Sequence, residues 1–271
     1  LGCGASLWEG GVRGYPEFSD VQLKAFADSF LSTPEGRVER ARVTVLLYPF
    51  IYNFDYREGR GALGALTRFK NKDAALLLAL LHMAGIDFDI VTRDEVVRDP
   101  GILHRYDAVI LADVYRIDRE LLKVLVEYRR DGGGLLVQGR TGIADRYGRK
   151  SLSILAELLG VSSPIQELRV AWYSWRYSNI TDVLLRGLRG EVGDSGRLQP
   201  YYIPVFDYAR EGFRVLATLE GMPDVAVVGR RGRVVFWFPR MGMQLLEAGP
   251  YVANTLKFLR NLYAFFTSGG G

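Results

Sequence analysis

The sequence has little cysteine, histidine, asparagine or glutamine. It contains one cysteine, Cys3, and two histidines, His82 and His104, while Asn and Gln number five each. A single cysteine cannot form a disulfide within the chain, and we expect it to be buried as a small apolar residue. His82 lies in an apolar stretch and is predicted to pack in the core, whereas His104 is predicted at a solvated helix end. No His/Cys/Asp/Glu group has ligand spacing, so neither a metal nor a cofactor is predicted.

Charge of one sign is not concentrated anywhere. The net charge is +4, and no run of basic residues exceeds two. Nucleic-acid binding needs a concentrated basic stripe, so this class of function is not expected. Arg supplies 29 of the 35 basic residues. This bias, with the scarcity of amides, fits a thermophilic source, although a GC-rich genome gives the same bias.

Long apolar runs are also absent. The densest one, 74–84, is interrupted by His82, and a membrane span needs about 18 apolar residues. No membrane span is therefore expected. The start Leu1-Gly2-Cys3 is similar to a lipoprotein cleavage box, but no apolar region precedes it. The cytoplasm is favoured as the location, with secretion and surface anchoring left open.

Short apolar runs alternate with helical patterns from residue 42 to residue 159, which predicts an α/β fold. Alternation of this kind is typical of a mainly parallel sheet with right-handed crossovers. Strands are predicted at 42–48, 87–92, 106–112 and 135–138, and helices at 74–84, 95–98, 118–130 and 151–159. Asp113 and Asp145 fall at strand or loop ends and are interpreted as loop caps, with ligand binding as the alternative.

The C-terminal part is richer in β-structure. Its predicted strands are 168–173, 201–206, 214–219, 225–228 and 234–238, the last two forming a hairpin around 229–233, and a helix over 251–266 closes the domain. We predict three segments along the chain: an N-terminal β-loop-α segment (1–40), an α/β domain (41–267) and a flexible tail (268–271).

Five motifs follow one another in a characteristic order and spacing: Ala84-Gly-Ile-Asp-Phe-Asp-Ile-Val91, Tyr106-Asp-Ala-Val-Ile-Leu111, Asp131-Gly-Gly-Gly-Leu-Leu-Val137, the run 140–148 and Leu155-Ala-Glu-Leu-Leu-Gly-Val161. Together they resemble the class I glutamine-amidotransferase-like fold, specifically the middle (trimerisation) domain of the family 42 β-galactosidases. The resemblance implies a flavodoxin-like three-layer sandwich and a homo-oligomer, specifically a trimer. It also implies a glycosidase barrel in the same or a separate chain. Segment 1–40 would then be the end of such a barrel, or else an extension of its own.

Active amidotransferases of this superfamily carry a cysteine on a tight strand-to-helix turn and a later histidine as base. The matching turn here is Gly139-Arg140-Thr141-Gly142, which keeps the glycines but has no cysteine, and no histidine follows it. The resemblance therefore implies a degenerate elbow and a pseudoenzyme without independent activity. It leaves open whether the parent protein is a glycoside hydrolase. Thr141 is a weak candidate for a substitute nucleophile.

Two further groups of residues are candidate sugar or partner contacts. Glu9 beside Trp8 is a weak candidate for a catalytic acid, since a glycosidase needs a second carboxylate at defined separation. The aromatic cluster consists of Trp172, Tyr173, Trp175, Arg176 and Tyr177. Such a cluster stacks on sugars, forms a protein interface or packs into the core.

Three functions remain open from the sequence. The first is a non-catalytic assembly domain of a β-galactosidase-like glycoside hydrolase, which would also help to shape a neighbouring sugar site. The second is a free-standing carbohydrate-binding or sensor protein. The third is a hydrolase or transferase that uses an atypical elbow nucleophile.

Overall fold

The computed structural model describes most of the predicted α/β domain. It describes residues 41–47, 72–170, 175–177, 181–188, 201–239, 241 and 250–268. All of them belong to one compact unit, Ala41–Gly271. Trp8 and Glu9 lie outside the described residues, as do Trp172 and Tyr173. The division of the chain into three segments stays a prediction.

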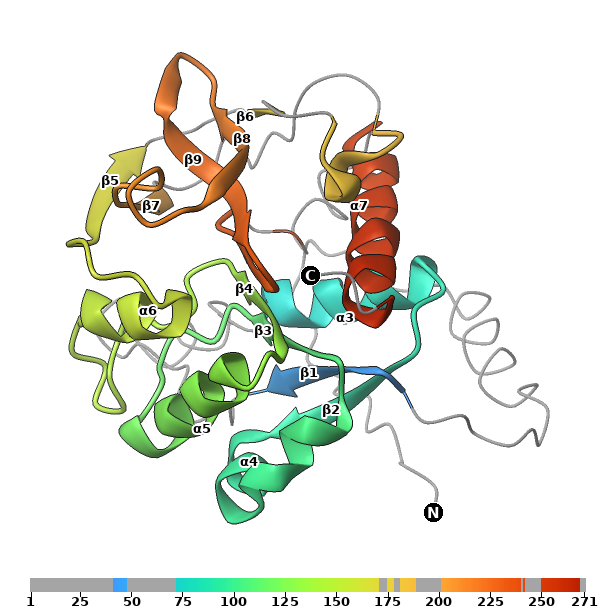
Figure 1. Ribbon diagram of the computed structural model, residues 1–271, viewed down its shortest axis with the longest axis vertical. Coiled ribbons are helices and arrows are strands. Elements are labelled where there is room, and N and C mark those ends of the chain that lie inside the picture. The colour runs from blue at the N-terminus through green and yellow to red at the C-terminus, as the bar shows by residue number, and fades with distance from the viewer. Residues whose placement is uncertain are drawn as a thin grey trace, which may run out of the picture. The chain divides into compact units, whose positions relative to one another are not determined.

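A mainly parallel, eight-stranded sheet is the centre of the described part (Figure 1), which confirms the α/β prediction. The strand order is β2-β1-β3-β4-β10-β9-β8-β6. The first five strands of this order run parallel to one another, and the last three are joined by antiparallel pairing. The strands are β1 Val43–Leu47, β2 Phe88–Thr92, β3 Ala108–Ala112, β4 Gly134–Gln138, β6 Trp175–Tyr177, β8 Arg214–Leu219, β9 Met222–Arg231 and β10 Val234–Trp237.

A second, two-stranded sheet pairs β5 (Gln166–Val170) with β7 (Tyr201–Val205) in antiparallel fashion. The C-terminal part is thus richer in β-structure, as the sequence predicted. The predicted hairpin is present, but its turn is shorter than predicted. Val234 pairs with Arg231, so only Gly232 and Arg233 form the turn. Residues 229–231 belong to β9, because an apolar partner strand extends the pairing beyond the point where the apolar pattern ends.

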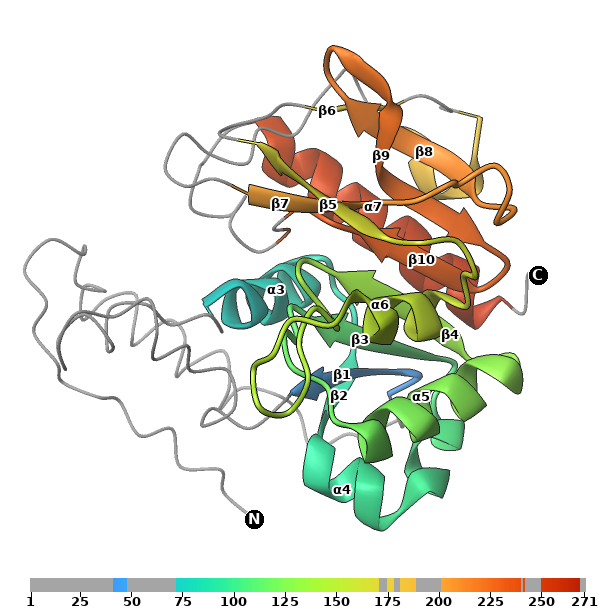
Figure 2. The ribbon, with the colours of Figure 1, turned by 90° about the vertical axis from the view of Figure 1, so that its left-hand side faces the viewer.

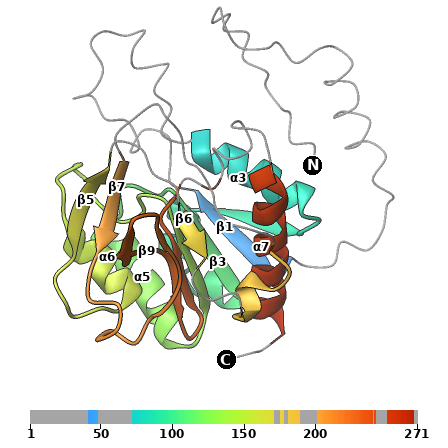
Figure 3. The same ribbon diagram turned by 90° about the horizontal axis from the view of Figure 1, so that it is seen from above.

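Helices cover both faces of the sheet. They are α3 Lys72–Met83, α4 Arg93–Arg98, α5 Arg119–Arg130, α6 Leu152–Leu159 and α7 Pro250–Thr267, with 3-10 helices η2 Pro100–Arg105 and η3 Val183–Leu185. Helix α3 packs against α7, whereas α5 packs between α4 and α6. Figures 2 and 3 show α3 and α7 on one face of the sheet and α5 and α6 on the other.

Local sequence explains where these helices begin and end. Thr92 and Glu95 form a capping box at the start of α4, which satisfies two backbone amides. Asp118 caps α5 by accepting a hydrogen bond of 2.9 Å from the Leu121 amide. Gly160 ends α6 in the left-handed conformation, with φ of 68°, which glycine adopts at little cost.

The prediction for His82 is wrong. Its side chain is exposed near the end of α3, whereas the sequence predicted a core histidine. The buried positions in this part of the helix are Leu77, Leu80, Leu81 and Ala84. Because α3 is apolar almost all around, its periodicity does not show which side faces the core.

Aromatic side chains fill the core beneath β10. The Phe236 ring lies 4.5 Å from Phe238 and 5.5 Å from Phe213, measured between ring centroids. On the neighbouring position, Trp237 packs against Phe258 of α7 at 4.4 Å. These side chains are fully or almost fully buried. Each such ring buries a large apolar area, so β10 joins the parallel half of the sheet to α7.

Three sets of hydrogen bonds join segments that lie far apart in the sequence. The Arg42 guanidinium donates to the Thr267 carbonyl at 2.7 Å, which brings the first strand and the end of α7 together. Arg233 donates to the carbonyls of Phe266 and Asp107 at 2.9 and 2.8 Å. Elsewhere the buried Glu211 carboxylate accepts hydrogen bonds from Ser162 and Ser163.

Desolvation acts to raise the pKa of Glu211. The hydrogen bonds from Ser163 and Ser162 outweigh it and lower this pKa to about 2. The carboxylate therefore stays ionised and holds the loop before β5 to the loop before β8.

Candidate functional site

The turn predicted to be a degenerate elbow, Gly139-Arg140-Thr141-Gly142, which is called the elbow below, lies where the carboxyl ends of β3 and β4 meet. These strands are parallel neighbours, and Ala112 is paired with Gln138. Asp113 and the turn Gly139-Arg140-Thr141-Gly142 therefore leave the sheet side by side. Ligands of open α/β sheets usually bind at this edge, so the position is the one at which chemistry is expected.

Asp113 holds the turn through its backbone. Its carboxylate Oδ1 accepts a hydrogen bond of 2.7 Å from the Arg140 amide, and the residue is 6% exposed. It adopts a φ of 51°, the single positive φ of a non-glycine residue within the described ranges. Because the Arg140 N–H already has an acceptor, it does not point at a bound oxyanion. Asp113 thus acts as a loop cap.

Gly139 is required at the start of the turn for two reasons. Its φ is +64°, a region that disfavours side chains. A Cβ at this position would lie 2.6 Å from Asp113 Oδ1, closer than van der Waals contact permits. The same glycine that a nucleophile elbow uses for a tight bend serves here to admit the Asp113 carboxylate.

The Thr141 hydroxyl is buried among backbone groups. The residue is 1% exposed. Its Oγ1 accepts from the Val114 amide at 3.0 Å and lies 2.6 Å from the Gln138 carbonyl and 3.1 Å from the Leu111 carbonyl. A hydroxyl has one proton to donate, and both candidate acceptors are backbone carbonyls. Thr141 therefore joins β3 to β4, and its contacts include no side-chain base.

Arg140 extends from the turn to the small sheet. Its guanidinium carbon lies 4.8 Å from the Tyr115 ring centroid and 5.1 Å from that of Tyr202 on β7. Its Nη2 lies 3.8 Å from Oε1 of Glu167, whose side chain is 4% exposed. Lys150 also pairs with Glu167. Two aromatic rings and a shared carboxylate hold the arginine over the corner.

Both histidines lie away from this corner. His82 is near the end of α3, which leads into β2, and His104 is in η2, which leads into β3. Both segments therefore reach the amino edge of a parallel sheet, whereas the elbow follows its carboxyl edge. His104 stacks edge-on against Tyr128, 5.8 Å between centroids, and its Nε2 lies 3.7 Å from Asp131 Oδ2. As the prediction states, His104 is exposed at a helix end.

The three described residues of the aromatic cluster differ in burial. Trp175 is 0% exposed and packs edge-on against Trp237 at 6.3 Å. Tyr177 is half-buried, and burial raises its pKa to about 12. Arg176 is exposed, and its Nη2 lies 2.6 Å from Glu220 Oε1. Of these three residues, only Arg176 presents most of its side chain to a partner.

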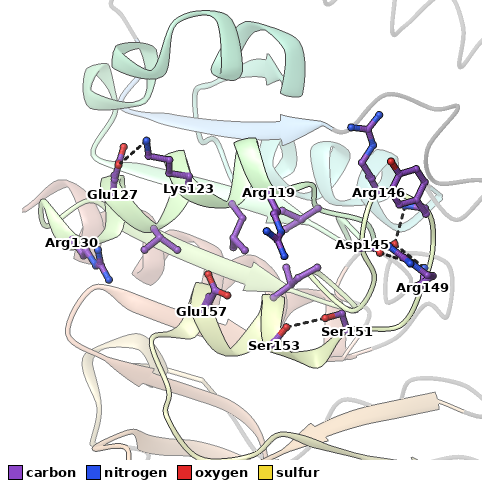
Figure 4. A pocket seen from close by; sticks show the side chains of 15 residues that line it. Arg119, Lys123, Glu127, Arg130, Asp145, Arg146, Arg149, Ser151, Ser153 and Glu157 are labelled. Atoms are coloured by element: carbon purple, nitrogen blue, oxygen red, sulfur yellow. Dashed lines mark hydrogen bonds and ion pairs between the residues drawn. The ribbon is translucent and has the colours of Figure 1, made fainter.

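A groove between α5 and α6 is the other notable surface of the described part (Figure 4). Its volume is about 810 Å³, within the usual range of ligand sites. Its lining includes residues of the loop 145–151 and the apolar side chains of Leu122 and Ile154. We call this feature the α5–α6 groove.

The loop 145–151 is organised by Asp145. The Asp145 carboxylate accepts from the amides of Tyr147 and Arg149, each at 2.9 Å, and from Arg149 Nε at 2.9 Å. Desolvation acts to raise the pKa of Asp145, but these hydrogen bonds outweigh it and lower the pKa. Asp145 therefore caps its loop, in agreement with the sequence interpretation.

Within the described ranges no group of three or more His, Cys, Asp or Glu side chains is placed to hold a metal ion. No helix among the described residues is long and apolar enough to cross a membrane.

Comparisons with known proteins identify the fold. No family model matches the sequence. The beta-galactosidase BgaH of Haloferax lucentense is 38% identical over 69 residues, which are 26% of this chain and 10% of that protein. A catalytic mutant of Gan42B, a GH42 beta-galactosidase from G. stearothermophilus, superposes with a TM-score of 0.55 at 16% identity. That match covers 86% of this chain and 34% of Gan42B.

The chain therefore has a fold similar to one part of the GH42 β-galactosidases, and the predicted resemblance to that family is confirmed. It matches about a third of Gan42B (34%) and a tenth of BgaH (10%). A shorter protein has a similar fold. A protein described as ThuA-like, from Bacteroides uniformis, superposes with a TM-score of 0.52 at 14% identity. The match covers 87% of this chain and 96% of that one.

The sequence singled out the turn 139–142 but not the residues around it. Tyr115, Tyr202 and Glu167 were not singled out, because they come from a loop and from two strands of another sheet. The α5–α6 groove was also missed. The run Arg146-Tyr147-Gly148-Arg149-Lys150 was its one local signal, since an aromatic among cations is typical of an exposed recognition loop.

Proposed function

We propose that this chain is a non-catalytic, glutamine-amidotransferase-like domain of a β-galactosidase-like glycoside hydrolase. Its role would be oligomer assembly, with loops that help to shape a neighbouring sugar site. The observation that carries the proposal is the internal pairing of the degenerate elbow. Helices on both faces of the sheet also support a flavodoxin-like three-layer sandwich as the finer fold assignment.

The chemistry of acyl transfer needs groups that the elbow already uses elsewhere. An activated nucleophile requires a general base within hydrogen-bonding reach, and the Thr141 hydroxyl contacts backbone groups instead. An oxyanion hole requires amides that point at the substrate, and the Arg140 amide donates to Asp113. These two contacts support a structural role for the residues at this corner.

A pair of variants tests the absence of catalysis. We expect the purified chain to show no turnover of glutamine or of chromogenic galactosides that depends on Thr141. Thr141→Ser keeps the hydroxyl, whereas Thr141→Val removes it at nearly constant volume. Turnover that persists in Thr141→Ser and disappears in folded Thr141→Val would overturn the proposal, and it would favour the hydrolase or transferase reading.

Assembly is tested by mass in solution. The family resemblance implies a trimer, and one chain has a mass of 30.4 kDa. Light scattering over nanomolar to micromolar concentration should give a multiple of this mass, and three copies is the expected number. A strictly monomeric mass at every concentration would contradict the assembly role. The partner barrel is proposed to lie in the same or a separate chain, and the reading frame upstream of Leu1 would show which.

A free-standing carbohydrate-binding or sensor protein is the second candidate. The match to 96% of the ThuA-like protein favours it, since a chain of this size with this fold can be nearly a whole protein. It predicts a monomer that binds saccharides without turnover. A monomeric mass in solution would therefore favour this candidate over the assembly domain, whereas an oligomeric mass would favour the assembly domain.

A further inference from the structure

Three arginines on the rim of the α5–α6 groove have no acidic partner among the residues that the structure describes. Arg119 and Arg130 lie at the two ends of α5, and Arg146 lies on the loop 145–151 (Figure 4). None of these three guanidiniums has a hydrogen bond or ion pair with another described residue. All three residues are exposed. The other two cations of the groove are neutralised locally, because Lys123 pairs with Glu127 at 3.9 Å and Arg149 with Asp145 at 2.9 Å.

Contacts within the loop limit the conformations of its two arginines, Arg146 and Arg149. Tyr147 is 68% exposed, and the guanidinium carbons of Arg146 and Arg149 lie 5.1 and 5.3 Å from its ring centroid. Isolated bridges join Ala144 to Arg116 and to Lys150 at the base of the loop. Ring contacts and backbone pairing together reduce the number of arginine conformations, and this lowers the entropy cost of binding an anion.

Glu157 gives the groove a second kind of chemistry. It is exposed on α6 and lines the groove, and none of the described residues pairs with its carboxylate. Ser151 and Ser153 lie beside it, with their hydroxyl oxygens 2.9 Å apart. A carboxylate and two hydroxyls suit a ligand that has hydroxyl groups to donate. A ligand that carries only anionic groups would be repelled by Glu157, whereas an anionic ligand that also carries hydroxyl groups can donate hydrogen bonds to it.

We propose that the α5–α6 groove binds a carboxylate-bearing oligosaccharide. Arg119, Arg130 and Arg146 would pair with its carboxylates through planar, two-pronged hydrogen bonds. Glu157 would accept from its hydroxyl groups, and Leu122 and Ile154 would lie beneath its apolar face. The assignment to a saccharide, and not to an acidic peptide, rests in part on the proposed association with a glycoside hydrolase. The groove itself is independent of the assembly role.

The test is calorimetry with short oligogalacturonate at low salt. Wild-type protein should bind it, with affinity falling as salt rises, and should bind a neutral galacto-oligosaccharide of equal length more weakly. Arg119→Ala/Arg130→Ala should weaken binding at least about 10-fold, or about 1.4 kcal/mol. The matched control is Arg98→Ala/Arg210→Ala, which removes two exposed arginines outside the groove lining and should keep wild-type affinity. No binding, or equal loss in both double variants, would overturn the proposal.

Glu157 separates a saccharide from an acidic peptide. Glu157→Gln keeps an acceptor and removes the repulsion, so it should bind oligogalacturonate at least as well as wild type. Glu157→Ala should bind it more weakly than Glu157→Gln does. Equal affinities of these two variants, with polyglutamate bound as well as oligogalacturonate, would indicate a peptide partner and overturn the saccharide assignment.

The same samples separate this inference from the proposed function. An oligomer by light scattering that gives no heat with oligogalacturonate overturns the groove proposal and leaves assembly standing. A monomer that binds oligogalacturonate through Arg119 and Arg130 does the reverse.

Discussion

The elbow after β4 and the α5–α6 groove differ in how their polar groups are used. At the elbow, Asp113, Arg140 and Thr141 all bond within the protein. At the groove, Arg119, Arg130 and Glu157 have no such partners among the described residues. The elbow occupies the edge where chemistry is expected in this kind of sheet, yet the groove has the groups that a ligand can reach.

The difference shows that the position of a site in the sheet and the availability of its polar groups to a ligand are separate properties. A buried polar group without a partner is costly, so a buried corner that binds no ligand is stable only when its polar groups pair with one another. Exposed arginines carry little such cost, because water solvates them. Internal pairing therefore indicates a structural corner, and unpaired charge beside a groove indicates a surface that can bind.

The strongest test of the structural corner is Gly139→Ala. The new Cβ would lie 2.6 Å from Asp113 Oδ1 at a φ of +64°, so both the cap and the backbone must move. We expect the free energy of unfolding to fall by roughly 2–4 kcal/mol in chemical denaturation. Gly232→Ala is the matched control, with a φ of +53° and nothing within 4 Å, and should cost about 1 kcal/mol. Equal costs would show that the elbow is not tightly packed.

Asp113→Ala tests the cap itself. It leaves the Arg140 amide without its 2.7 Å acceptor, and we expect a loss of about 1–3 kcal/mol in the free energy of unfolding. Asp113→Asn keeps an oxygen acceptor and tolerates positive φ, so it should retain most of the stability. An alanine variant as stable as wild type would show that the carboxylate does not hold the turn.

Glu211 extends the comparison to pH, because it is another internally paired carboxylate. Its pKa in the folded protein is about 2, below the ordinary value of 4.5. The stabilisation of the folded state by the ionised Glu211 carboxylate is therefore complete above pH 4.5 and is lost as the pH falls toward 2. We expect wild-type stability to decline over this range. In Glu211→Gln, measured by the same denaturation series, this part of the decline should be absent, and an unchanged acid profile would contradict the assignment.

The smallest stability effect is expected at the groove. Arg119→Ala/Arg130→Ala should change the free energy of unfolding by no more than about 0.5 kcal/mol, because these side chains have no partner among the described residues. The measurement is thermal and chemical denaturation beside the calorimetry described above. A loss as large as that of Asp113→Ala would mean that the groove arginines are structural, and the contrast between the two regions would fail.

The sequence predicted the order of strands and helices well, because their apolar patterns are local. The strand at 214–219 and the helix at 118–130 match β8 and α5 to within one residue. Features that depend on contacts between distant segments could not be predicted from local patterns. The face of α3 that His82 occupies depends on packing, and two partners of Arg140, Glu167 and Tyr202, come from strands of another sheet. The elbow was located by its glycines, but its pairing with Asp113 required the register of β3 and β4.

The contact between Arg42 and Thr267 has a consequence for how this unit can be used. The residue before β1 and the last residue of α7 are joined by a hydrogen bond of 2.7 Å, at the sheet edge opposite the elbow. In a longer chain, the points at which the chain would enter and leave this unit are therefore neighbours. The unit can be inserted into a loop of a host protein without separating the two ends of that loop. The sheet edge that carries the elbow stays uncovered.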